Sequence, residues 1–456
     1  MRDMTRGGAR RTRRGVRAVV FALALAVLAP VARGDWLQPD PSYRDAQFLL
    51  RQAQRDTLDH GNDPVRLDSL GVALLRLGRT ADAATIFGRT LAVRPNDPAA
   101  LAAIGKLALF AGRLAEAESL LTLAGPDPAA LADLYAARLR RGEWARAAEL
   151  APQVNEAGRV PMLTWLAEHP PFRITGPDVA RVQWNKSYPI PLLRVKLNGQ
   201  SVLMGLDTGA RDLILDQSFA RRCNVTIMPT QVPVFWEGTR IAVQNAVVQR
   251  LELGGLRIED VPAGVAGLRS WSNTVNPQDE PVAGVIGLAL LQRFTPTIDY
   301  RDRVLILRKA GTPALATARA QRVPFEIWGE SELTVRGSIA GGRTMAMVVG
   351  TGLAGCGVGA PEAVFSEVGV KPGALSRAIK GAGSWLQGRP WASLTVPTVT
   401  VGPLVRDRVT GWSGALDDAE LWRHGVRRDA ILSHDFFKNQ RLTFDWDHRE
   451  LIVENE

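Results

Sequence analysis

Apolar and polar residues follow two different periods along this chain of 456 residues. From residue 40 to about residue 170, apolar positions recur with helical spacing in a stretch rich in alanine, leucine and arginine. Prolines and glycines interrupt that pattern between residues 166 and 185. Beyond it, short runs of Val, Ile, Leu and Thr alternate with Gly, Pro and Asn, and Asn198-Gly199 is a strong hairpin signal. The pattern predicts an α+β multidomain protein, with a helical domain before an all-β domain.

The helical part contains a repeat that starts at an Asp-Pro pair. Asp63-Pro64 recurs 34 residues later as Asp97-Pro98, and then as Asp127-Pro128. Equivalent positions in the three copies hold similar residues: Leu67, Leu101 and Leu131; Leu70, Ile104 and Leu134; Gly78, Gly112 and Gly142; and Ala83, Ala117 and Ala147. Gly71, Gly105 and Phe87 occupy further positions, where two helices must pack closely. This spacing resembles tetratricopeptide repeats, whose period is 34 residues. The resemblance implies stacked helix pairs over residues 40–170, which act either as a groove for a peptide or protein partner or as a scaffold for the next domain.

The β part is doubled with a longer period. Residues 284–307 align without gaps to residues 430–453, at an offset of 146. Upstream, Leu206-Asp207-Thr208-Gly209 aligns to Val349-Gly350-Thr351-Gly352 at an offset of 143. We therefore expect two similar lobes, over residues 186–310 and 322–456, with a linker rich in Ala and Thr at 309–321. Because the period changes near residues 166–185, we also expect a chain that starts near Val179 to fold without the helices.

A short motif in the first lobe carries the candidate chemistry. Asp207-Thr208-Gly209 lies between two apolar runs, residues 202–206 and 213–215. Val285-Ile286-Gly287 follows about 80 residues later, and a Thr-Ile-Asp-Tyr run follows at 297–300. Together these features resemble the retropepsin-like family of bacterial aspartyl proteases, which are pepsin-type enzymes. The resemblance covers most of residues 186–456.

The resemblance implies how the site works. Aspartic proteases hydrolyse peptides with a water that two carboxylates activate, and these lie about 3 Å apart and share one proton. Here Asp207 is the catalytic carboxylate, Gly209 lets the loop turn tightly, and the Thr208 hydroxyl is expected to hydrogen-bond across to the partner loop. A hairpin flap closes over the substrate in this family. Its candidates are Trp236-Glu237-Gly238 and Gly381-Ala382-Gly383.

The second lobe departs from the family pattern. Gly350-Thr351-Gly352 stands where Asp-Thr-Gly is expected, the nearest acid downstream is Glu362, and Ser433 replaces the glycine that matches Gly287. The leading prediction is an aspartic-type endopeptidase without a cofactor. The sequence leaves the source of its second carboxylate open, and Asp207 of another chain in a homodimer could supply it. One alternative is an impaired pseudoprotease that binds peptides or proteins. The other is an assembly scaffold that acts through the helical repeats.

The N-terminus has the features of an export signal. Residues 1–34 carry a net charge of +7 and include an apolar run, Ala18 to Leu28, that is shorter than the ~20 residues that span a bilayer. Ala32-Arg33-Gly34 places small residues at a cleavage site, so we expect the mature chain to begin at Asp35. We therefore expect a periplasmic or extracellular protein, or one anchored by an uncleaved signal. Thr12-Arg13-Arg14-Gly15-Val16 loosely resembles a twin-arginine signal.

The remaining composition excludes several classes of function. Without residues 1–34 the net charge is only +3, and no basic run is interleaved with aromatic residues, so nucleic-acid binding is not expected. The five histidines are scattered and no HExxH or CxxC spacing occurs, so no metal site is predicted. The two cysteines, Cys223 and Cys356, either pair after export or remain buried thiols, and the pattern favours buried thiols.

Overall fold

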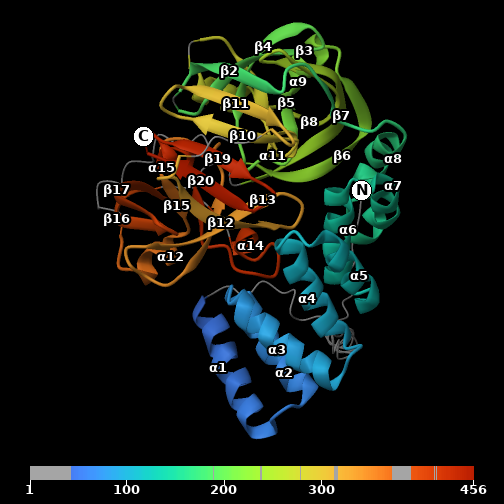
Figure 1. Ribbon diagram of the computed structural model, residues 1–456, viewed down its shortest axis with the longest axis vertical. Coiled ribbons are helices and arrows are strands. Elements are labelled where there is room, and N and C mark those ends of the chain that lie inside the picture. The colour runs from blue at the N-terminus through green and yellow to red at the C-terminus, as the bar shows by residue number, and fades with distance from the viewer. Residues whose placement is uncertain are drawn as a thin grey trace, which may run out of the picture. The chain divides into compact units, whose positions relative to one another are not determined.

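The computed structural model describes residues 43–187, 189–236, 239–277, 279–312, 317–371, 392–414, 416 and 418–455. The predicted signal peptide, part of the predicted linker, Gly381-Ala382-Gly383, and Glu237-Gly238 of the other flap candidate lie outside these residues. Residues Pro39–Glu456 form one compact unit. Helices fill its N-terminal part and strands most of the rest (Figure 1). Within the described ranges, no helix has both the length and the apolar character needed to cross a membrane.

Each Asp-Pro pair marks the start of a helix. The carboxylates of Asp63, Asp97 and Asp127 accept hydrogen bonds of 2.9–3.1 Å from the backbone amides two and three residues further on. The proline that follows occupies the first helical position, where its missing N–H costs no hydrogen bond. The helical elements are α1 (Tyr43–His60), α2 (Pro64–Arg76), α3 (Thr80–Val93), α4 (Pro98–Phe110), α5 (Leu114–Ala124), α6 (Pro128–Arg141), α7 (Trp144–Leu150), η2 (Ala151–Val154), η3 (Ala157–Arg159) and α8 (Val160–Glu168).

Two glycines of the repeat allow neighbouring helices to approach closely. A Cβ atom on Gly71 would lie 2.7 Å from the ring of Phe87, and one on Gly105 would lie 2.7 Å from the side chain of Leu121. Both distances are too short for real atoms, so α2 packs on α3, and α4 on α5, only because these positions lack a side chain. The prediction that Gly71, Gly105 and Phe87 lie at close helix contacts is confirmed.

The strands form two β segments. The first β segment contains β1 (Arg173–Thr175), β2 (Val179–Lys186), β3 (Leu192–Leu197), β4 (Gln200–Leu206), β5 (Leu213–Asp216), α9 (Gln217–Arg222), β6 (Thr226–Trp236), β7 (Thr239–Leu253), β8 (Leu256–Ala266), α10 (Arg269–Val275), β9 (Val282–Ile286), α11 (Leu288–Leu291), β10 (Phe294–Asp299) and β11 (Val304–Lys309). The second contains β12 (Gln321–Trp328), β13 (Glu332–Ile339), β14 (Met345–Val349), β15 (Val358–Ala360), α12 (Glu362–Glu367), β16 (Ala392–Val401), β17 (Leu404–Ser413), α14 (Asp418–Leu421), β18 (Ala430–Leu432), α15 (His434–Phe437), β19 (Arg441–Asp445) and β20 (Glu450–Glu454). Asn198 and Gly199 both have positive φ, at 47° and 87°, and form the predicted hairpin turn between β3 and β4.

The two β segments repeat the same strand pairing. β4 pairs in parallel with β9, and β14 pairs in parallel with β18. β10 and β19 then meet as antiparallel neighbours in a sheet that both segments share. In that sheet Thr297 lies opposite Thr443, the residue at offset 146, and their hydroxyl oxygens are 2.8 Å apart. The internal alignment of the sequence thus has a physical counterpart, because equivalent residues face each other where the segments meet.

The helices and the β segments share buried side chains. Trp328, at the end of β12, is fully buried and stacks on Phe110 of α4 with ring centroids 5.0 Å apart. Met162 of α8 belongs to one apolar cluster with Met228 and Val247 of the first β segment. The change of period marks a change of secondary structure, while the apolar contacts continue across it. These shared contacts argue against independent folding of the β segments, which stays a prediction to be measured.

A pair of carboxyl groups between α2 and α4 makes stability depend on pH. Burial, followed by the proximity of Asp97, raises the pKa of the Asp68 carboxyl to about 7, although Thr90 and Arg94 oppose the shift. The folded chain therefore keeps a proton on Asp68 between about pH 4 and pH 7, where the unfolded chain has lost it. The free energy of unfolding should fall as the pH rises through this window.

We expect Asp68→Asn to remove this pH dependence. The melting temperature of the variant should equal that of the wild type near pH 4 and exceed it at pH 8, as measured by thermal denaturation across this range. Asp59→Asn, at an exposed position of α1, is the matched control and should follow the wild type. Parallel pH profiles for Asp68→Asn and the wild type would show that Asp68 does not hold the proton.

Candidate active site

The Asp207 loop is held by the strands on either side of it. β4 is buried over its last five residues and ends at Leu206, and the backbone amide of Asp207 then donates to the carbonyl of Ile286 on β9, at 3.1 Å. A Cβ atom on Gly287 would lie 2.2 Å from the carbonyl oxygen of Asp212, so only glycine lets these two backbones pass. The amide of Leu288 donates to the carbonyl of Ala210 at 2.8 Å. The predicted segment Val285-Ile286-Gly287 thus packs against the backbone of the Asp207 loop and forms hydrogen bonds with it.

Two threonines link this loop to its counterpart in the second β segment. The Thr208 hydroxyl donates to the carbonyl of Val349 at 2.7 Å, and the Thr208 amide donates to the Thr351 hydroxyl at 2.9 Å. In the reverse direction, the Thr351 hydroxyl donates to the carbonyl of Leu206 at 3.3 Å and the Thr351 amide donates to the Thr208 hydroxyl at 3.2 Å. Both threonines are at most 1% exposed. The hydrogen bond predicted for Thr208 is present, and it belongs to a reciprocal set that fixes the two loops against each other.

The carboxylate of Asp207 lies at the centre of this arrangement. Its Oδ1 accepts hydrogen bonds from the amides of Gly209, at 2.8 Å, and Gly352, at 2.9 Å. A Cβ atom on Gly352 would lie 2.2 Å from Cγ of Asp207, so a side chain at position 352 would displace the carboxylate. Burial raises the pKa of Asp207 above its ordinary value, and the amides of Gly209, Gly352 and Ala210 offset only part of the shift. Asp207 therefore keeps its proton to a higher pH than an exposed aspartate does.

Gly350 occupies the place that is equivalent to Asp207. Its Cα lies 3.4 Å from where a Cβ of Gly209 would be, so the two loops are in close contact there. The shift in the pKa of Asp207 has no contribution from any carboxylate; its causes are burial and backbone amides alone. Within the described residues, the site thus presents one carboxylate where a catalytic pair would need two.

A network of charges behind the loop carried no signal in the sequence. Arg211, four residues after Asp207, pairs with Asp212 and with Glu330 of the β12–β13 turn. Glu330 also accepts from Arg159 of η3, at 3.0 Å, and Arg159 is 4% exposed. Burial raises the pKa of Glu330, but Arg159 and Arg211 lower it by more, to about 2. The network joins the helical part, the second β segment and the Asp207 loop through one ionised carboxylate.

The β6–β7 hairpin reaches the second β segment beside the site. Its strands pair as far as Trp236 and Thr239. Val234 and Ile241 of the hairpin pack on the apolar cluster that also contains Ala354 of the second β segment and borders Ala210. Arg240 of β7 lies 3.6 Å from Glu420 of α14. The hairpin therefore contacts the second β segment next to Ala210, while Glu237 and Gly238 at its predicted tip lie outside the described residues.

The other sequence candidates have simpler outcomes. Cys223 and Cys356 are both buried and free, which the sequence favoured over a disulfide. Ser433, which replaces the glycine equivalent to Gly287, donates from its hydroxyl to the carbonyl of Cys356. Over the described ranges, no cluster of three or more His, Cys, Asp or Glu side chains could hold a metal ion.

Known proteins are similar to only part of this chain. Residues 193–290 match a family model described as aspartyl protease. Protein DDI1 homolog 2 from Danio rerio is 28% identical over 123 residues, which are 26% of this chain and 27% of that protein. Human Protein DDI1 homolog 1 is 27% identical over 121 residues, 26% of this chain and 28% of that protein. The matched stretch thus spans about a quarter of the length of these curated relatives.

A solved structure is similar over a comparable length. The crystal structure of a retropepsin-like aspartic protease from Rickettsia conorii covers 30% of this chain and 94% of that chain, with 17% identity and a TM-score of 0.20. The family match and the curated relatives both fall on a stretch of about the size of one predicted lobe. The resemblance to the aspartyl proteases is therefore confirmed over residues 193–290, the stretch that carries Asp207, Thr208 and Gly209.

Proposed function

We propose that this protein is a catalytically impaired aspartic protease, which binds extended peptides at Asp207 between two pepsin-type lobes. The observation that carries the proposal is that reciprocal threonine hydrogen bonds join the two loops, while one loop has Asp207 and the other has Gly350 at the equivalent position. The loops, the flap-like hairpin and the glycines of a protease are retained. The second carboxylate is replaced, so binding is retained while the acid–base pair is lost.

A homodimer does not restore the pair in this proposal. In a homodimeric protease the partner chain supplies the second loop. Here the loop at residues 349–352 of the same chain already fills that position and bonds to Thr208 from both directions. A second copy of Asp207 could enter only if these four buried hydrogen bonds were broken. We therefore propose that the cleft acts within one chain, which departs from the dimer that the sequence suggested.

The remaining carboxylate is suited to recognition of a peptide. Oδ1 of Asp207 accepts hydrogen bonds from the amides of Gly209 and Gly352, and neither of these two amides bonds to Oδ2. Because burial raises the pKa of Asp207, the protonated form persists to a higher pH and can donate from Oδ2 to a peptide carbonyl. An ionised Asp207 would instead repel that carbonyl oxygen. Peptide binding should thus strengthen as the pH falls through the pKa of Asp207.

The helical part is a scaffold in this proposal rather than a separate recognition domain. α4 packs on Trp328, and the Arg159 side chain supports Glu330 beside the active-site loop. We propose that these tetratricopeptide-like helices brace the second lobe. We further propose an exported location for the protein, periplasmic or extracellular, which rests on the basic and apolar pattern of residues 1–34.

Peptide binding and cleavage by purified monomer test the proposal. With a labelled casein digest, we expect binding that weakens about tenfold as the pH rises through the pKa of Asp207, and cleavage no faster than in Asp207→Asn. Asp207→Asn, which cannot ionise, should bind with an affinity independent of pH. Glu362→Gln changes an exposed acid of α12 and serves as the matched control. Efficient cleavage by wild-type monomer that Asp207→Asn abolishes would contradict the claim of impaired catalysis.

A further inference from the structure

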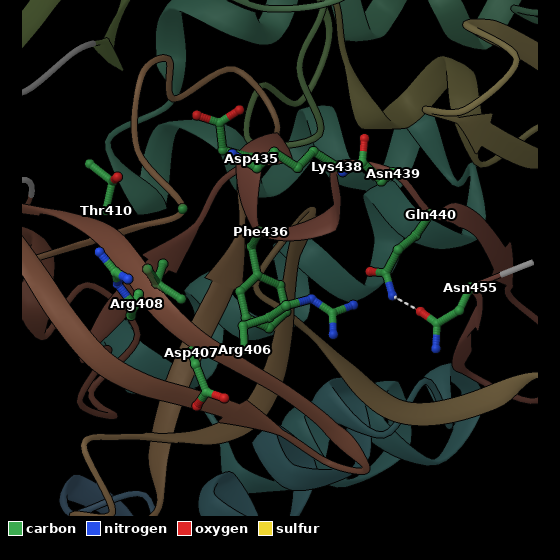
Figure 2. A pocket seen from close by; sticks show the side chains of 12 residues that line it. Arg406, Asp407, Arg408, Thr410, Asp435, Phe436, Lys438, Asn439, Gln440 and Asn455 are labelled. Carbon is green, nitrogen blue, oxygen red and sulfur yellow. Dashed lines mark hydrogen bonds between the residues drawn. The ribbon is translucent and has the colours of Figure 1, made fainter.

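A second candidate site lies in the second β segment, apart from both active-site loops. It is a pocket of about 360 Å³, within the size range of small-ligand sites. Figure 2 shows its side chains, most of which come from β17, α15 and the residues directly after α15, while Asn455 follows β20. The pocket is lined by Gly357, Arg406, Asp407, Arg408, Val409, Thr410, Asp435, Phe436, Lys438, Asn439, Gln440 and Asn455.

One wall of the pocket is a strained turn of backbone. Arg408 has a φ of 52°, in the left-handed region that bulky residues rarely adopt. The register between β16 and β17 is the same before and after this residue, with Val396 opposite Val409 and Thr398 opposite Asp407, so Arg408 lies opposite Pro397. Backbone strain of this kind is common at binding sites. β17 also has a partner on one side only between Leu404 and Val409 in the described pairings.

Three cations and two acids line the pocket. Among the described residues no salt bridge is formed by Arg406, Arg408 or Lys438, and Arg406 donates only to the backbone carbonyl of its neighbour Val405, at 2.9 Å. Its guanidinium lies 5.8 Å from the ring centroid of Phe436, which fixes its direction. Of the two acids in the lining, Asp407 accepts from the Thr398 hydroxyl at 3.0 Å. Burial raises the pKa of the other, Asp435, although Lys438 opposes the shift.

An acceptor in the pocket lacks a donor. Gln440 is 3% exposed and its Nε2 donates to Oδ1 of Asn455 at 2.5 Å, whereas its Oε1 is buried and has no hydrogen-bond partner in the part of the chain that the structure describes. A buried amide oxygen without a donor costs about 1–3 kcal/mol. Figure 2 shows Arg406 extending past Phe436 toward Gln440 and Asn455. The pocket thus offers positive charge and an unused acceptor on the same side.

We propose that this pocket binds the C-terminal residue of a peptide. Such a residue carries a carboxylate, which Arg406 and Lys438 would take, together with an amide N–H, which Oε1 of Gln440 would accept. The free edge of β17 can pair with the extended main chain that precedes it. An inorganic anion would satisfy the cations but would bring neither the amide N–H nor the main chain of a peptide. The proposal concerns a site separate from Asp207 and does not depend on the function proposed for the cleft.

Calorimetry with the full chain and three probes tests this proposal. The probes are acetyl-trialanine with a free carboxylate, the same peptide as its C-terminal amide, and inorganic phosphate. We expect the free carboxylate to bind at least about tenfold more tightly than the amide or phosphate. Arg406→Gln and Lys438→Gln should each weaken its binding by about tenfold, and Gln440→Met should reduce the preference for the peptide over phosphate.

Two variants separate this pocket from other sites. Arg319→Gln removes an exposed arginine outside the lining and should bind acetyl-trialanine as the wild type does, while Asp207→Asn reports whether this peptide binds in the cleft instead. Equal binding of the amide and the free carboxylate would overturn the proposal. So would tighter binding of phosphate, because the ligand would then be a different anion. Loss of binding in Asp207→Asn would show that the peptide binds in the cleft, and this result would also overturn the proposal.

Discussion

Gly350→Asp combined with Ile431→Val should raise peptide hydrolysis by roughly 10²–10⁴-fold over the wild type, the usual contribution of acid–base catalysis. The wild-type loops already have the amides that hold a catalytic carboxylate, since Gly209 and Gly352 both donate to Asp207. A second carboxylate at position 350 would lie across from the first at the same loop contact. The two would share a proton, so that one could activate water and the other protonate the leaving amine.

The backbone at position 350 accepts a side chain. Gly350 is not among the residues with positive φ, so an aspartate there needs no left-handed conformation. A Cβ atom would lie 3.0 Å from Cγ2 of Ile431, which is tight enough to require a small shift. Val285 is the equivalent of Ile431 in the first β segment, beside the loop that does carry an aspartate. Ile431→Val therefore copies the residue that stands at this position beside Asp207, although valine keeps Cγ2 and the small shift is still required.

The measurement is the rate of peptide cleavage at acid pH by the monomeric double variant. Asp207→Asn in the same background should abolish the gain, and Ile431→Val alone should leave cleavage at the wild-type rate. The melting temperature of each variant separates lost folding from lost chemistry. A folded double variant that cleaves no faster than the wild type would show that the loops no longer hold two carboxylates in a catalytic geometry.

Local and periodic features of this fold could be predicted from the sequence. The Asp-Pro pairs mark helix starts because capping needs only residues that are neighbours in the chain. The offset of 146 predicted that residues 297 and 443 are equivalent, and duplication places equivalent residues opposite each other at a shared sheet. The contact of Thr208 with its partner loop followed from family resemblance in the same way.

Contacts between unlike parts of the chain could not be predicted. Glu330 is 171 residues from Arg159 and 119 from Arg211, and neither spacing belongs to a repeat or a motif. The same holds for Trp328, whose aromatic partner lies in the helical part. The sequence predicted that Thr208 bonds to a partner loop, but it did not show that Thr351 of the same chain belongs to that loop. Because Thr351 bonds to Thr208, the loop of this chain already occupies the position that a second chain would need.

Removal of the helical part should make the β segments insoluble. A chain that starts at Val179 would uncover Trp328, which is fully buried against α4, and would leave Glu330 without Arg159. The backbone carbonyls of Ile327 and His424 would lose the donors Arg140 and Lys106, at 3.0 Å and 3.1 Å. Exposed aromatic surface together with unpaired buried groups favours aggregation over a stable fold.

A point variant in the full chain measures the same contact without truncation. Trp328→Ala should lower the free energy of unfolding by about 3–5 kcal/mol, the usual cost of removing a buried tryptophan, because both the Phe110 stack and the Nε1 bond to Glu326 are lost. Phe48→Ala, at an aromatic residue of α1 that is 60% exposed, is the control and should change it by less than about 1 kcal/mol. Chemical denaturation of both variants, and of chains starting at Tyr43 and at Val179, provides the comparison. A soluble Val179 chain that unfolds cooperatively, together with a Trp328→Ala variant as stable as Phe48→Ala, would show that the helices do not support the β segments.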